Sequence, residues 1–155
     1  MRFFEEILAN HLLFAAICAW AISQVLKVFT NLCISRTWDV KRLFGDGGMP
    51  SAHSATVVAL AVMSGYMCGF NSAEFAIAFI FAVVVMRDAI GVRRETGKQA
   101  KSIKELAEVI NGTLDKDAAI RTENLKLLVG HTPLQVVCGA VVGCVVATLY
   151  ILIVL

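Results

Sequence analysis

The sequence has few charged residues and almost no proline. Only 17% of its 155 residues are charged, and these cluster between long apolar runs. The two prolines, Pro50 and Pro133, each stand at the start of such a run. With 58% hydrophobic residues and a mean hydropathy of +0.75, the chain lies well above the roughly 45–50% apolar content of soluble domains. The composition therefore predicts a membrane protein.

Metal-ligand spacing is also missing from the sequence. The five cysteines lie in or beside apolar segments and form no CxxC or Cys/His pattern, so they are interpreted as small buried hydrophobes. No metal, cofactor or nucleic-acid partner is expected. The N-terminal apolar run has no clear small-residue cleavage site, which argues against a removed signal peptide. The lack of a targeting segment favours a bacterial membrane.

Four apolar stretches are long enough to cross a bilayer, which takes about 20 residues. They cover residues 12–32, 50–70, 72–92 and 133–155. The alternative is three spans, with the first stretch lying flat in the interface. The chain is thus predicted to be a single all-α integral membrane domain over residues 1–155. It would form a polytopic bundle of about four transmembrane helices plus one cytoplasmic amphipathic helix.

The basic residues predict the orientation. They fall in the segments 35–48 and 93–131, whereas the turn around Asn71 has none. Since cytoplasmic loops are rich in Lys and Arg, both segments are expected in the cytoplasm and both termini outside. Within the second segment, residues 98–111 carry apolar side chains at helical spacing and end at Gly112. This helix could lie on the membrane or cover a substrate.

Two pairs of glycines stand four residues apart within predicted spans, Gly65/Gly69 and Gly139/Gly143. This spacing allows helix backbones to approach closely. The pairs could serve packing inside the bundle or, alternatively, a homodimer interface.

Three polar segments interrupt the apolar pattern. The first, Gly47 to Ser54, opens the second span: its glycines, including Gly48, free the backbone, and Ser51 can cap the helix. A helix N-terminus of this kind favours an anion, so Gly48 and Ser51 are predicted to bind phosphate. His53 would stand at the mouth of this site as a proton donor. The alternative is a helix cap beside an ordinary interfacial histidine.

The second segment closes the third span. It contains Asp88, which could pair with Lys27, Arg93 or Arg94, and it is followed by Lys98. Charged side chains at such depth are usually paired or functional. Ordinary anchoring of the span by the two arginines is the alternative.

The third segment, Gly130 to Gln135, opens the fourth span with His131. Gln135 lies one turn further along and could orient the imidazole of His131. The predicted topology brings Lys27, His53, Asp88 and His131 to one membrane face, while His11 falls on the other. Two histidines with several cations suit metal-free phosphoryl transfer, in which one histidine attacks phosphorus and the other protonates the leaving oxygen.

These segments, Gly-Gly-Met-Pro-Ser-Ala-His-Ser, Asp-Ala-Ile-Gly-Val-Arg-Arg-Glu-Thr-Gly-Lys-Gln-Ala and Gly-His-Thr-Pro-Leu-Gln-Val, resemble the divergent branch of the type 2 phosphatidic acid phosphatase superfamily. That superfamily is related to acid phosphatases and vanadium-dependent haloperoxidases. The resemblance implies a lipid or prenyl phosphate phosphatase with a phosphohistidine intermediate and no divalent metal. It implies His131 as the nucleophile and His53 as the general acid, with Lys27 and Arg36 binding phosphate.

The sequence departs from the family pattern at two positions. Leu125 stands where the third motif has an arginine, which Arg93 or Arg94 could replace, and Gln135 stands where it has an aspartate. These departures favour the alternative function, a non-catalytic membrane protein that binds anionic lipid or phosphate. A transporter is disfavoured because no inverted repeat is visible. The chain is also shorter than the usual six-helix bundle, so a homodimer could complete the site.

Overall fold

The protein is built from helices. The structure is a computed structural model that describes residues 2–36, 48–112 and 132–155, without the side chains of residues 34, 35 and 92–94. Within these ranges there are six helices and no strands: α1 (Arg2–Leu8), α2 (His11–Ser35), α3 (Ala52–Cys68), α4 (Ala73–Ile90), α5 (Val92–Asn111) and α6 (Pro133–Val154). The all-α prediction is confirmed, and the short α1 is an element that the sequence patterns did not predict.

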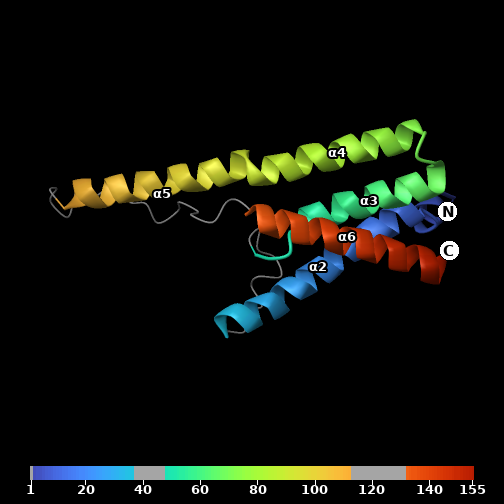
Figure 1. The fold of residues 1–155 in the computed structure, drawn as a ribbon, viewed down its shortest axis with the longest axis horizontal. Coiled ribbons are helices and arrows are strands. Elements are labelled where there is room, and N and C mark those ends of the chain that lie inside the picture. Colours follow the sequence, from blue (N-terminus) through green and yellow to red (C-terminus); the bar gives the residue numbers. More distant parts are fainter. Residues whose placement is uncertain (1, 37–47, 113–131) are drawn as a thin grey trace.

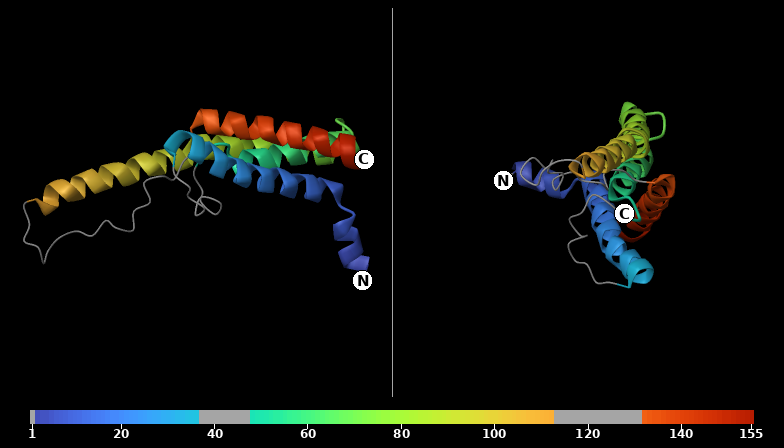
Figure 2. Two further views of the ribbon diagram at one scale, coloured as in Figure 1. Left: turned by 90° about the horizontal axis from the view of Figure 1, so that it is seen from below. Right: turned by 90° about the vertical axis from the view of Figure 1, so that its left-hand side faces the viewer.

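Helix α3 occupies the centre of a bundle in which it contacts α2, α4 and α6 (Figures 1 and 2). Three helical stretches are long and apolar enough to cross a membrane: His11–Cys33, Ala73–Asn111 and Pro133–Val154. The apolar helix α3 is shorter, with 17 residues, or about 26 Å at about 1.5 Å per residue. The helical membrane bundle is therefore confirmed, with a second helix that is shorter than the predicted 50–70. The N- and C-terminal ends of the chain lie at the same end of the bundle (Figure 1).

Small side chains at every fourth position bring the three central helices together. Because residues four apart lie on one helix face, each helix presents a narrow buried stripe, and small residues let helix backbones approach in a membrane. The stripe on α2 is apolar near its start and polar toward its end. The buried stripe on α2 comprises Ala15, Ala19, Ser23, Lys27 and Asn31. The stripe on α3 comprises Ala55, Ala59 and Met63, and it continues to Ser51, the N-cap of the helix.

The Gly139/Gly143 pair makes the closest contact between helices. A Cβ at Gly139 would overlap the carbonyl oxygen of Ser51 and lie 3.0 Å from Ser54 Cβ, and one at Gly143 would overlap the carbonyl oxygen of Ala55. The prediction of close packing inside the bundle is confirmed for this pair. It is wrong for the other pair, because Gly65 faces the ring of Phe70 and Gly69 ends α3 with a φ of +92°.

Helix α5 continues the direction of α4 beyond the bundle (Figure 1). The two are separated only at Gly91, whose N–H donates to the carbonyl oxygen of Arg87 at 2.8 Å. The predicted amphipathic helix over residues 98–111 is therefore the larger, C-terminal part of a longer helix that begins at Val92 and ends, as expected, before Gly112. Its side chains Ile103 and Leu106 are exposed.

Candidate functional site

The first turn of α3 is held by two buried serines. Ser51 is the N-cap, and its Oγ accepts from the backbone N–H of Ser54 at 3.4 Å and from Ser54 Oγ at 3.0 Å. The backbone N–H of Ser51 donates to the carbonyl oxygen of Gln135 at 3.0 Å. The cap predicted for Ser51 is present: its hydroxyl caps α3, and its N–H joins the starts of α3 and α6. Phosphate binding by Ser51 stays a prediction.

Lys27 lies against this segment from α2. Its side chain is only 3% exposed and runs past Gly48, where an added Cβ would lie 3.8 Å from Lys27 Cγ. Gly48 has a φ of +108°, a conformation that L side chains rarely adopt. The Thr30 hydroxyl is within hydrogen-bonding reach of the carbonyl oxygens of Lys27 and Met49. Burying a lysine side chain inside a membrane bundle costs free energy, and such residues are usually functional. The buried Lys27 therefore marks this end of the bundle as the candidate functional site.

Helix α6 begins with a capping box. Gln135 N–H donates to Thr132 Oγ1 at 3.4 Å, and Thr132 N–H donates to Gln135 Oε1 at 3.0 Å. Pro133 occupies the first turn, where its missing N–H is not needed. His131 lies outside the described residues, so its predicted contact with Gln135 stays a prediction. What the structure shows is that the side-chain oxygen of Gln135 already closes the helix cap.

His53 and Asp88 line one pocket of about 300 Å³ between α3 and α4, together with Val84, Val85 and Ala89. The sequence reasoning assigned Asp88 to a basic partner and missed that it shares a pocket with His53. A signal was present: His53 precedes Asn71 by 18 residues and Asp88 follows it by 17. In an antiparallel pair joined by a tight turn, positions equally far from the turn lie level with each other.

The other predicted cations lie away from this cluster or are not described. Arg36 is the exposed C-cap of α2, nine residues beyond Lys27, which is about 14 Å along a helix. Lys98 pairs with Glu95 at 2.6 Å on the exposed surface of α5. Arg93 and Arg94 belong to the first turn of α5, and their side chains are among those not described.

The structure thus brings Lys27, Gly48, Ser51, His53 and Gln135 to one end of the bundle, with Asp88 beside His53. Among the residues in the described ranges, no group of three His, Cys, Asp or Glu side chains could hold a metal ion. The described residues of this cluster supply an imidazole, an ammonium group, a carboxylate and the backbone dipole of a helix N-terminus.

Comparison with known proteins shows the family of this chain. The profile described as "Divergent PAP2 family" matches residues 8–146. The chain belongs to this family. The uncharacterized membrane protein YuiD of Bacillus subtilis (strain 168) is 39% identical over 145 residues, which cover 89% of this chain and 92% of YuiD. No solved structure gives a significant match.

The stretch that matches the Divergent PAP2 family includes the helices that carry the candidate site. The matched residues run from α1 through most of α6 and include Lys27, His53, Asp88 and His131. The protein is therefore an integral membrane protein of this family, in contact with membrane lipids.

Proposed function

We propose that this Divergent PAP2 family protein is a membrane phosphatase that hydrolyses a lipid or prenyl phosphate through a phosphohistidine intermediate. The observation that carries the proposal is the buried Lys27 side chain against Gly48, at the same end of the bundle as His53 and the start of α6. A buried cation beside a helix N-terminus suits an anionic substrate. Family membership supports the same class of reaction.

In the first step an imidazole nitrogen of His131 attacks phosphorus. The N–P bond forms as the P–O bond to the lipid alcohol breaks, and His53 gives its proton to the leaving oxygen. Lys27 neutralises charge on the equatorial phosphate oxygens. Asp88 is a positioning residue that orients His53 from across their shared pocket.

In the second step water hydrolyses the phosphohistidine. His53 now accepts a proton from the water as its oxygen attacks phosphorus, the N–P bond breaks, and inorganic phosphate leaves. The free nitrogen of His131 and the proton on His53 are thereby restored, and the enzyme is ready for the next substrate molecule. Gln135 holds the start of α6, the helix that directly follows His131, through its cap to Thr132.

We further propose that the site faces the cytoplasm of a bacterial cell. The basic segments 35–48 and 93–131 adjoin the helix ends that carry the candidate site, and cytoplasmic loops are enriched in Lys and Arg. The substrate would then be a lipid phosphate made on that side. A homodimer that completes the site is part of the same proposal, and crosslinking in membranes that yields only monomer would count against it.

The proposed function is tested by phosphate release from detergent-purified protein. A panel of phosphatidic acid, phosphatidylglycerophosphate and polyprenyl phosphates is incubated with and without EDTA. We expect release from at least one lipid phosphate, and we expect EDTA to leave its rate unchanged. No release from any substrate by folded protein would favour a non-catalytic protein that binds anionic lipid.

Removal of the Lys27 charge should slow the reaction without unfolding the bundle. For Lys27→Gln we expect phosphate release to fall about 10²–10³-fold, the range found when one group that stabilises transition-state charge is lost. Lys101→Gln is the matched control, because Lys101 lies on the exposed surface of α5, 3.6 Å from Glu105. Rates are compared for variants with the helical circular dichroism of the parent. A Lys27→Gln rate equal to that of the control would remove Lys27 from the phosphate site.

A further inference from the structure

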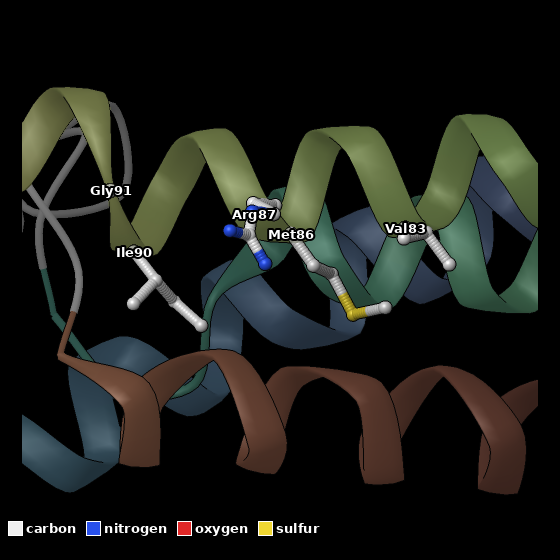
Figure 3. A pocket seen from close by; sticks show the side chains of 5 residues that line it. All are labelled: Val83, Met86, Arg87, Ile90 and Gly91. Carbon is white, nitrogen blue, oxygen red and sulfur yellow. The ribbon is translucent and has the colours of Figure 1, made fainter.

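An open pocket of about 460 Å³ lies on the face of α4 that is turned away from the His53 pocket. It is lined by Val83, Met86, Arg87, Ile90 and Gly91. Figure 3 shows Met86 and Ile90 projecting from α4 toward α6. The lining is apolar except for Arg87, a residue that the sequence motifs did not single out. The pocket is distinct from the cluster of Lys27, His53 and Asp88.

This pocket continues into a second one of about 320 Å³. Val83 and Met86 line both, and the second is completed by residues of α3, α4 and α6 that include Val58, Phe75, Phe79 and Cys144. Apart from the thiol of Cys144, every side chain that lines it is apolar. The two pockets adjoin at Val83 and Met86, on the face of α4 that is turned toward α6. We call them together the groove between α4 and α6, with Arg87 near one end and Phe75 near the other.

The length of this groove suits a hydrocarbon chain. Gly91, the C-cap of α4, lies 16 positions beyond Phe75, which corresponds to about 24 Å along the helix axis at about 1.5 Å per residue. One leaflet of a bilayer contributes only about 15 Å of the roughly 30 Å hydrocarbon core. A single long tail could therefore lie between the two helices along the whole depth of a leaflet.

Arg87 gives the groove a charge at one end only. It lies in the last turn of α4, on the level of the candidate site, and it forms no ion pair with any other residue in the ranges that the structure describes. A guanidinium has a planar set of N–H donors that matches phosphate oxygens. An apolar groove that ends in such a donor is complementary to a lipid with an anionic headgroup. A lipid without net charge would not neutralise the positive charge of Arg87.

We propose that the groove between α4 and α6 binds one lipid phosphate molecule, with its hydrocarbon tail along Met86, Val83 and Phe79 and its phosphate on Arg87. The identity of this lipid as the substrate rests on the proposed function. The groove would then select substrates with a long apolar tail and admit them sideways from the bilayer. Arg87 would hold the headgroup as it enters, ahead of any step at His131.

Two phenylalanines of α4 provide a matched pair of reporters. Phe79 lines the groove and is 50% exposed. Phe81 is 52% exposed and lines a separate, wide-open apolar hollow on α4 that shares no residue with the groove and has no charged residue. The variants Phe79→Trp and Phe81→Trp are made in a background in which Trp20 and Trp38 are changed to Phe. Each is placed in phosphatidylcholine nanodiscs with a small fraction of lipid that carries brominated acyl chains, which quench nearby tryptophan. The brominated lipid is either phosphatidylcholine or a non-hydrolysable phosphonate analogue of phosphatidic acid.

For Phe79→Trp we expect half-quenching at an about tenfold lower fraction of the phosphonate than of brominated phosphatidylcholine, because charge-assisted hydrogen bonds contribute about one such factor or more. Phe81→Trp should be quenched equally by both lipids. Adding Arg87→Gln to Phe79→Trp should bring the two lipids to within about twofold. Quenching measures binding and does not depend on catalysis. Selective quenching by a protein that releases no phosphate would therefore refute the proposed phosphatase function and leave the proposal of a lipid-binding groove standing.

Three results would overturn the groove proposal. The first is equal quenching of Phe79→Trp by both lipids, which would mean that the groove holds ordinary bilayer lipid. The second is the same preference at Phe81→Trp, which would mean that anionic lipid gathers around the whole bundle. The third is a preference at Phe79→Trp that Arg87→Gln leaves unchanged.

Discussion

Alanine at His131 is expected to abolish phosphate release, and alanine at His53 is expected to slow it by about 10²–10⁴-fold. The two effects differ because His131 would form the bond to phosphorus, whereas His53 would transfer a proton that water can supply less efficiently. His53 lines the pocket that it shares with Asp88 at the start of α3. Both variants are assayed for phosphate release on the best substrate of the panel, after their helical content has been matched to that of the parent.

His11 offers the control for these two histidines. Its Nδ1 lies 3.1 Å from the hydroxyl of Tyr150, so it joins the start of α2 to the end of α6, at the end of the bundle opposite to His53. His11→Ala should therefore keep most of the phosphate release. Trapping of labelled phosphate on the protein in the parent and in His53→Ala, but not in His131→Ala, would identify the nucleophile. Full activity of His131→Ala would exclude the phosphohistidine mechanism.

Alanine at Gly139 or Gly143 is expected to destabilise the bundle strongly. The added methyl group would meet backbone atoms of α3, namely the carbonyl oxygens of Ser51 and Ala55, and in the case of Gly143 also Ala55 Cα at 3.0 Å. Backbone atoms of a packed helix cannot rotate away, so α6 would have to shift. Overpacking of a well-packed core typically costs about 1–3 kcal/mol, and we expect each variant to reach at least that range. The measurement is the Tm in detergent.

Gly65→Ala is the matched control, because its methyl group would also be too close to another atom, the ring carbon Phe70 Cε1 at 2.5 Å. The ring of Phe70 is 72% exposed and can turn aside. Since alanine also favours a helix interior over glycine by about 1 kcal/mol, Gly65→Ala should leave the Tm equal or higher. Equal Tm values for the three variants would show that α3 and α6 do not depend on the close approach.

Destabilisation at Gly139 should also lower phosphate release if the proposed function is right. Gly139 packs against Ser51, and the N–H of Ser51 donates to the carbonyl oxygen of Gln135. A shift of α6 would therefore move the start of that helix, and with it His131, relative to His53. Fold and proposed chemistry meet at this contact between α3 and α6.

The positions of the helices could be predicted closely from the sequence. The predicted ranges 12–32, 72–92 and 133–155 correspond to α2, α4 and α6 to within three residues at each end. These helix ends are local events, since Ser72 and Thr132 cap the helices that follow them and Gly91 interrupts α4 and α5. The second range was too long because Gly69 adopts a positive φ and ends α3 before the apolar run ends.

The gathering of Lys27, His53, Asp88 and Gln135 at one end could also be predicted, because antiparallel spans bring alternate loops to the same face. Which atoms come into contact at this end could not be predicted from the sequence. The sequence did not predict that Gln135 Oε1 accepts from the backbone N–H of Thr132. It also did not predict that Asp88 lines a pocket with His53. These outcomes depend on the rotation of each helix about its axis.

The sequence by itself therefore determined that this protein is an all-helical membrane protein of the Divergent PAP2 family, with its polar motifs at one end. The hydrophobic length of a span and the chemistry of a helix cap are properties of neighbouring residues, so they can be read along the chain. Only the tertiary structure decided that Gly139 and Gly143 pack against α3 and that Met86 and Arg87 line an open pocket on the face of α4 turned toward α6. Those features arise where helices distant in sequence fit their side chains together, and the fit depends on the packing of all of them at once.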